Sequence, residues 1–177
     1  MILGLDPGAT SGWCVYDPSS RRAIECGEFE GYEYGGTALD LVLHGAGSSA
    51  LRHVVIERPK GYGPTRPQMV DCGYVAGRLA ERVSRRDSLY PTEVHELTRI
   101  EVCKILTAAM HGALNVRNDA TAWAALLELH GEQAGRKAQR KKGIEIAPAG
   151  PLGIVTGHAR AALAVAVAFA ISRGEFK

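Results

Sequence analysis

The chain has 177 residues, of which 46% are hydrophobic, so it has enough apolar mass for the core of one domain, and we expect a single domain over residues 1–177. It contains no apolar run of 18 residues, and its first apolar run lacks the basic start and cleavage site of a signal peptide. We therefore expect a soluble cytoplasmic protein without membrane association. The net charge of +2 does not by itself indicate nucleic acid as a partner, and four cysteines without C-x-x-C spacing argue against a zinc knuckle or a thioredoxin-like motif.

The first 30 residues have the pattern of an antiparallel meander. Residues 1–6 and 12–17 read as two short strands, and the stretch between them, Pro-Gly-Ala-Thr-Ser-Gly, is typical of a turn. Residues 22–30 alternate well enough to predict a third strand.

The middle of the chain alternates between helix and strand. Residues 35–43 are a weak helix candidate, and residues 51–57 form a β-branched run typical of a buried central strand. Residues 61–67 hold two prolines and two glycines and therefore predict a loop. From 68 to 86 the pattern is helical, with one apolar side made of Met69, Cys72, Val75, Leu79 and Val83.

The last part of the chain is mainly helical. We expect a strand at 88–95, helices at 97–111 and 118–130, and a final helix from His158 to about Ser172. A basic segment bounded by glycines, residues 135–143, precedes a connector rich in proline and glycine. Strands first, helices last and alternation between them indicate a mixed α/β domain.

Two acidic residues stand where strands end. Asp6 closes the first apolar run and Glu57 closes the 51–57 run, and strand ends are where α/β folds place ligands. If these strands are neighbours, the two carboxylates converge, and a hard cation such as Mg²⁺ or Mn²⁺ would relieve their repulsion. Taken singly, Asp-Pro-Gly is also a good turn sequence, a glutamate before Arg-Pro can simply end a strand, and His158 can simply begin a helix.

Three segments around these residues resemble the motif blocks of the RuvC Holliday junction resolvases, which belong to the RNase H-like nuclease superfamily. They are residues 2–12 (ILGLDPGATSG), residues 54–59 (VVIERP) and residues 158–166 (HARAALAVA). The resemblance implies an α/β, RNase H-like fold with a mixed five-stranded sheet flanked by helices. It also implies hydrolysis of phosphodiesters in four-way and related branched DNA, with two Mg²⁺ or Mn²⁺ ions per site and 5′-phosphate products.

By this resemblance Asp6, Glu57 and His158 match metal ligands and catalytic residues, and Ala161 stands where the family has a further catalytic Asp. Residues three apart share one helix face, so His158 and an Asp at 161 could reach one metal cluster. With alanine there, the site loses a negative charge that two divalent ions need. We hypothesise that the chain is a deliberately inactivated Asp-to-Ala variant. The alternatives are a natural homologue that binds junctions without cutting them, and one more alanine in an alanine-rich helix.

The resemblance also suggests contacts with DNA and with a second subunit. Tyr62 matches an aromatic residue that wedges into the junction crossover, and residues 68–86 match a helix that forms a homodimer. Basic side chains neutralise phosphates, so we expect DNA contacts from the positively charged residues beside the site and in the basic segment. These are Arg58, Lys60, Arg136, Lys137, Arg140, Lys141 and Lys142. By the resemblance, Lys104, in the helix after the fifth strand, matches a lysine that contacts DNA in the family. For the cluster at 136–142, a solvated flexible loop is an equal alternative.

Two other functions fit parts of the pattern. Residues 6–12 also resemble the first phosphate loop of actin-like kinases, but 177 residues leave no room for both lobes, and no second Gly-rich phosphate loop is present. A branched-DNA-binding protein without turnover would share every feature except catalysis. The pattern does not decide between a bacterial and a phage-infected bacterial host.

Overall fold

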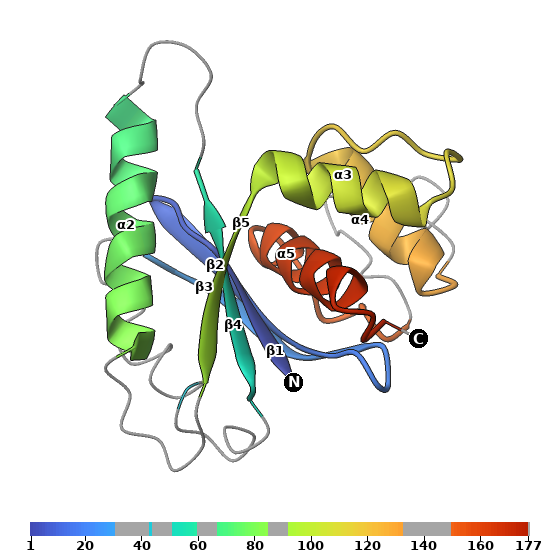
Figure 1. Ribbon diagram of the computed structural model, residues 1–177, viewed down its shortest axis with the longest axis horizontal. Helices are drawn as coiled ribbons and strands as arrows, with labels where there is room; N and C mark the ends of the chain where they lie inside the picture. The colour runs from blue at the N-terminus through green and yellow to red at the C-terminus, as the bar shows by residue number, and fades with distance from the viewer. Residues whose placement is uncertain (31–42, 44–50, 60–66, 85–91, 133–149, 177) are drawn as a thin grey trace, which may run out of the picture.

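The computed structural model describes residues 1–30, 43, 51–59, 67–84, 92–132 and 150–176 (Figure 1). These residues form five strands and four helices. The strands are β1 (Ile2–Asp6), β2 (Thr10–Asp17), β3 (Arg22–Glu30), β4 (His53–Arg58) and β5 (Glu93–Thr98), and the helices are α2 (Pro67–Ser84), α3 (Arg99–Ala109), α4 (Asp119–Leu129) and α5 (Ala159–Ser172). None of these helices combines the length and the apolar character needed to cross a bilayer.

The strands form one mixed sheet in the order β3-β2-β1-β4-β5. The meander β1-β2-β3 is antiparallel, whereas β4 is parallel to β1 and β5 is parallel to β4. The predicted mixed five-stranded sheet flanked by helices is therefore confirmed. Because β1 and β4 are parallel neighbours, their carboxyl ends meet at the same edge of the sheet.

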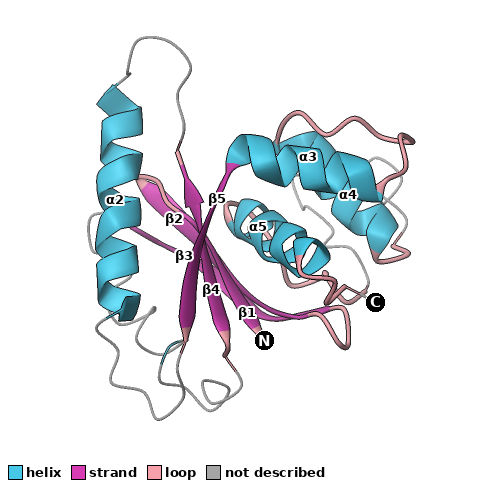
Figure 2. Ribbon diagram, viewed as in Figure 1, coloured by secondary structure: helices cyan, strands magenta, loops and turns pink. Residues whose placement is uncertain are grey.

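Helices cover both faces of the sheet. The long α2 lies against one face, and α3, α4 and α5 lie against the other (Figures 1 and 2). The alternation of side chains along β1 and β4 divides the core accordingly. Leu3, Leu5, Val54 and Ile56 pack with the buried side of α2, and Ile2 and Val55 belong to the cluster around α5.

The close packing of α5 on the sheet depends on two glycines. The helix is buried along almost its whole length, and its backbone lies directly on β1 and β2. A Cβ atom added at Gly4 would collide with the carbonyl oxygen of Ala162, and one added at Gly12 would collide with that of His158. Only glycine permits this close approach, which fixes the first turn of α5 over the sheet edge where β1 ends.

The structure corrects the predicted boundary between β5 and α3. The strand predicted at 88–95 is described only from Glu93 and continues to Thr98, so residues 97 and 98, predicted as helix, are strand. Thr98 caps α3 and forms a capping box with Glu101, a Thr-x-x-Glu pattern that places the helix start at Arg99. The helix predicted at 35–43 lies outside the described residues except for Leu43. The helix predicted at 68–86 is confirmed in outline, with Val75, Leu79 and Val83 buried.

Candidate active site

Asp6 and Glu57 lie side by side at the carboxyl ends of β1 and β4. In the parallel register Leu5 pairs with Ile56, so the next residues along the two strands are these two acids. Their side chains are only 16% and 10% exposed. Burial raises the pKa of Asp6 to about 6 and that of Glu57 to about 7. The fold thus holds two carboxylates in a place where carrying a charge is unfavourable without a cation.

His158 lies beside this pair at the start of α5. Its Nδ1 atom is 3.9 Å from Oδ2 of Asp6, and its side chain is about half exposed. The backbone N–H of His158 donates a hydrogen bond to Glu28 on β3, and this carboxylate is well placed at a helix N-terminus. Gly12 and Glu28 both contact this turn, so the backbone of His158 is held at the edge of the sheet where β1 ends.

Ala161 is buried, with 7% exposure, but it belongs to neither hydrophobic cluster of the core. It lies three residues after His158, so the two share one face of the helix. The methyl group of this alanine supplies no ligand atom.

Arg99 is a residue of the site that the sequence did not predict. As the first residue of α3 it follows β5 directly, and its guanidinium reaches three carboxylates. Nε lies 3.0 Å from Oε1 of Glu57, and Nη2 lies 3.7 Å from Oδ1 of Asp6. Nη1 lies 2.8 Å from Oδ1 of Asp119, a close ion pair that lacks the alignment of a hydrogen bond. The Thr98–Glu101 capping box was the feature of the sequence that could have placed Arg99 at this edge.

Asp119 comes from the first turn of α4, and its carboxylate is well exposed. The sequence analysis did not assign it to the site. Its negative charge contributes to raising the pKa of Asp6 and of Glu57. The site therefore gathers acids from three elements that are far apart in the sequence.

The charges and the donor atoms of the site fit one divalent cation. Three carboxylates and one guanidinium leave two negative charges uncompensated when all are ionised. Oε2 of Glu57 is buried and has no hydrogen-bond partner among the described residues, which is the state of an oxygen available for a ligand. Asp6 and Glu57 supply the hard oxygen donors that Mg²⁺ and Mn²⁺ prefer, with the ring of His158 next to them.

The candidate DNA-contacting residues are only partly described. Arg58 is exposed at the end of β4 and pairs with Glu96 at 3.3 Å. Lys104 lines a groove of about 560 Å³ along α3, together with Arg99 and Arg117. The other predicted contacts lie outside the described residues; they are Lys60, Tyr62, Arg136, Lys137, Arg140, Lys141 and Lys142.

Comparison with known proteins supports the fold. The sequence matches no protein-family model and no curated protein. Among solved structures, Thermus thermophilus RuvC in complex with a Holliday junction substrate matches with a TM-score of 0.57 and 16% identity, over 99% of this chain and 96% of that chain. Another structure of T. thermophilus RuvC matches with a TM-score of 0.56 and 15% identity, over 98% and 95% of the two chains. The chain has the RNase H-like fold of these proteins, as the sequence predicted.

Proposed function

We propose that the chain binds four-way and related branched DNA and that its site is that of a structure-selective, metal-dependent DNA endonuclease leaving 5′-phosphates. The observation behind this proposal is the pairing of β1 with β4, which brings Asp6 and Glu57 together beside the first turn of α5. Similarity to RuvC over nearly the whole chain, in one case to a structure with a Holliday junction, supports DNA as the substrate class.

In this proposal Asp6 and Glu57 would hold Mg²⁺ or Mn²⁺ through their oxygens, with His158 as a third ligand. A bound ion of this kind activates water for in-line attack and stabilises the oxygen that leaves. As an alternative to binding the ion, His158 would orient a phosphate or a water with its half-exposed ring. Arg99 holds the two carboxylates in position and reduces the repulsion between them before an ion arrives.

Ala161 is expected to weaken hydrolysis. The part of the site that the structure describes supplies donor atoms and charge for one divalent ion, whereas the resemblance in the sequence implies two when an Asp stands at 161. An engineered change and a natural one have the same consequence, because both leave the face of α5 next to His158 without a carboxylate. We therefore propose that this chain cuts slowly or not at all, and that an acid at 161 restores cutting.

A junction-binding protein without turnover is the second candidate. It is favoured by the ion pairs of Arg99, whose guanidinium already neutralises part of the charge on Asp6 and Glu57. Such a site could keep its carboxylates together without metal and present a surface of suitable shape to DNA.

In this proposal the phosphate backbone of the DNA runs along α3. Lys104 is exposed five residues after Arg99, and Arg117 lies on the same groove. The positive charges of Lys104 and Arg117 could bind phosphates of the DNA strand that approaches Asp6 and Glu57. Arg58, at the other side of Glu57, could hold the neighbouring phosphates.

A homodimer would suit a junction with approximate two-fold symmetry. On the outer side of α2, Val70 and Tyr74 are 59% and 56% exposed and lie one turn apart. We propose this side of α2 as the dimer interface. The proposed substrate would place the protein in the cytoplasm of a bacterial or phage-infected bacterial cell.

The binding part of the proposal can be tested apart from catalysis. The affinity for a synthetic four-way junction would be measured against a linear duplex of equal length, in Ca²⁺ and in chelator. We expect the junction to bind roughly 10³-fold more tightly. Lys104→Ala should weaken binding and reduce the slope of log affinity against log salt concentration by the equivalent of about one phosphate contact. Arg22→Ala, at the end of β3 far from the site, should change neither the affinity nor this slope. Equal affinity for junction and duplex would refute the proposal.

A further inference from the structure

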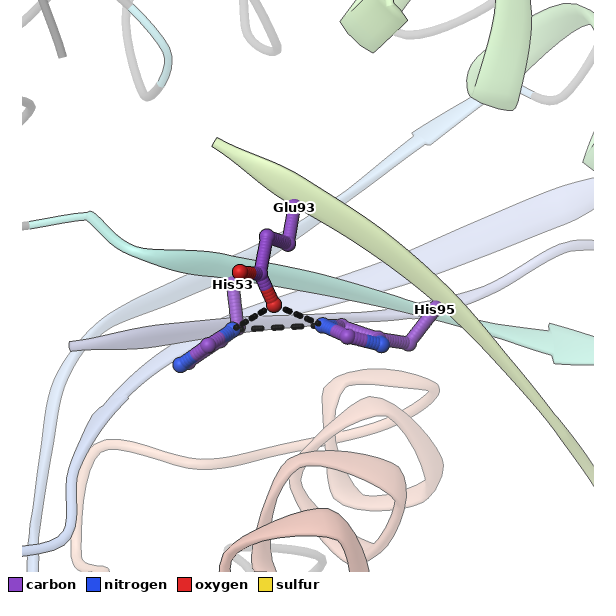
Figure 3. A group of neighbouring side chains, drawn as sticks. All are labelled: His53, Glu93 and His95. Atoms are coloured by element: carbon purple, nitrogen blue, oxygen red, sulfur yellow. Dashed lines mark hydrogen bonds and ion pairs between the residues drawn. The ribbon is translucent and has the colours of Figure 1, made fainter. Parts of the chain in front are cut away.

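A second group of potential ligands lies at the opposite end of the sheet from Asp6 and Glu57. His53 begins β4, Glu93 begins β5, and His95 follows two residues later on the same face (Figure 3). In the parallel register His53 pairs with Glu93, so these residues are neighbours although 40 positions separate them. His53 lies four residues before Glu57 on one strand, which is a separation of roughly 13 Å.

The three side chains point toward one another and their ligand atoms form a nearly equilateral triangle. Nδ1 of His53 lies 3.2 Å from Nε2 of His95. Oε2 of Glu93 lies 3.5 Å from the first of these nitrogens and 3.3 Å from the second. In a tetrahedral zinc site with bonds of about 2.0–2.1 Å, neighbouring ligand atoms are roughly 3.3 Å apart. The triangle thus has the dimensions of one face of such a tetrahedron.

The surroundings of His53 resemble those of a metal ligand. Its other ring nitrogen, Nε2, lies 3.8 Å from a carboxylate oxygen of Glu175. This is an ion-pair distance and not a hydrogen bond. A metal-bound histidine commonly donates its second N–H to a carboxylate, which fixes the ring and increases its basicity, and Glu175 could take this role after a small movement of its side chain. Phe169 of α5 packs against both imidazole rings, with ring centroids 5.2 Å and 4.5 Å away.

The exposure of the group leaves one side open. The side chain of His53 is 12% exposed and that of Glu93 is 62% exposed, so the triangle has a buried base and a solvent-facing edge. An ion above it could complete its coordination with a water molecule.

We propose that His53, Glu93 and His95 form a binding site for Zn²⁺ or a similar late first-row transition ion, separate from the Asp6–Glu57 site. Two imidazoles and one carboxylate favour such ions over Mg²⁺, which prefers oxygen ligands throughout. The ion would link the amino ends of β4 and β5 under α5 and, through Glu175, secure the end of the chain. This proposal does not depend on the nuclease function.

The test uses Zn²⁺ alone with the full chain, stripped of metal and carrying Asp6→Asn and Glu57→Gln to silence the other site. Titration calorimetry should show one Zn²⁺ per chain, and His95→Gln should weaken binding at least about 100-fold, with Glu175→Gln weakening it roughly 10-fold. His111→Asn, which changes an exposed histidine elsewhere, should bind Zn²⁺ like its parent. Equal binding by the His95→Gln protein would overturn the proposal and leave the group as a hydrogen-bonded cluster.

A second measurement needs no variant in the cluster and remains informative if His95→Gln fails to fold. In the same Asp6→Asn, Glu57→Gln protein, the ring nitrogens of the histidines would be followed by NMR during addition of Zn²⁺. We expect Nδ1 of His53 and Nε2 of His95 to shift together at one equivalent. No shift at these two rings, or shifts only at other histidines, would contradict the site.

Discussion

The guanidinium of Arg99 contacts carboxylates from Asp6, Glu57 and Asp119. It occupies the position of a built-in cation, and its loss would leave the two buried acids unpaired. We expect Arg99→Met to lower the free energy of unfolding by about 2 kcal/mol in chelator, less than for a fully buried pair because Arg99 is 30% exposed. Mg²⁺ should recover part of this loss. Chemical denaturation with and without Mg²⁺ measures both effects.

Arg58→Met is the matched control for Arg99→Met, since it breaks the exposed pair with Glu96 and should change stability by no more than about 0.5 kcal/mol. Equal stability of the two variants would show that Arg99 does not hold the site together.

The raised pKa of Glu57 predicts a pH dependence. Its pKa rises from 4.5 to about 7 on folding, chiefly through burial, so the folded chain binds more protons than the unfolded chain between these values. Stability should therefore be highest near the lower end of this range and decrease as the pH rises through 7. The loss in metal-free protein should be on the order of a few kcal/mol. Glu57→Gln should make the decrease smaller and leave the part due to Asp6, whose pKa is raised to about 6. Identical profiles for both proteins would contradict this account.

The close packing of α5 on β1 and β2 makes Gly12 a sensitive position at the level of elements. A methyl group there would collide with the carbonyl oxygen of His158, so the first turn of α5 would have to move. We expect Gly12→Ala to cost roughly 1–3 kcal/mol and to weaken binding of Mg²⁺ at the site. Thermal unfolding and Mg²⁺ titration would measure these changes.

Gly77→Ala in α2 is the comparison for Gly12→Ala, because a Cβ there meets nothing within 4 Å and alanine favours a helix by about 0.5–1 kcal/mol. It should be neutral or stabilising. If Gly12→Ala were as stable as Gly77→Ala, Gly12 would not be required for the close packing of α5 on the sheet.

The elements of the site differ in how far the sequence could predict them. Asp6 and Glu57 end apolar strands, so local pattern and the family resemblance located them. Arg99 was not predicted because its position depends on the residue at which β5 ends and α3 begins, and the capping box at Thr98 that marks this boundary was overlooked. Asp119 depends on how the start of α4 is oriented, which is a matter of tertiary packing.

The His53–Glu93–His95 cluster was also not predicted. It depends on the register between two parallel strands far apart in the sequence, and no local spacing encodes that register. The five-stranded sheet itself was predictable, because apolar runs of strand length and the RuvC-like motifs agree with each other. The sheet and the two acids at strand ends were therefore predictable from the sequence, whereas Arg99 and Asp119, which helices bring to the site, could be placed only from the structure.

At the scale of the whole molecule, the exposed apolar side chains of α2 predict a dimer. Val70 and Tyr74 are more than half exposed on one side of the helix. We expect the chain to sediment as a dimer and the Val70→Glu, Tyr74→Glu double variant to sediment as a folded monomer, because two buried charges would oppose association. Ile154→Glu changes a similarly exposed residue outside α2 and should remain dimeric. A monomeric parent chain would contradict the proposed interface.

We propose that this RNase H-like chain has a metal-dependent nuclease site in which Ala161 occupies the position of a catalytic acid. Single-turnover cleavage of a four-way junction in Mn²⁺ and Mg²⁺ tests it most directly, with a linear duplex as control substrate. Ala161→Asp should cut the junction at least about 100-fold faster than the parent chain, since a further carboxylate is worth several kcal/mol to the bound metal ions and the transition state. Adding Glu57→Gln to the Ala161→Asp protein should abolish this increase in cleavage rate. Tight junction binding by the parent and by Ala161→Asp, with no cutting by either, would contradict the claim and favour a junction-binding protein.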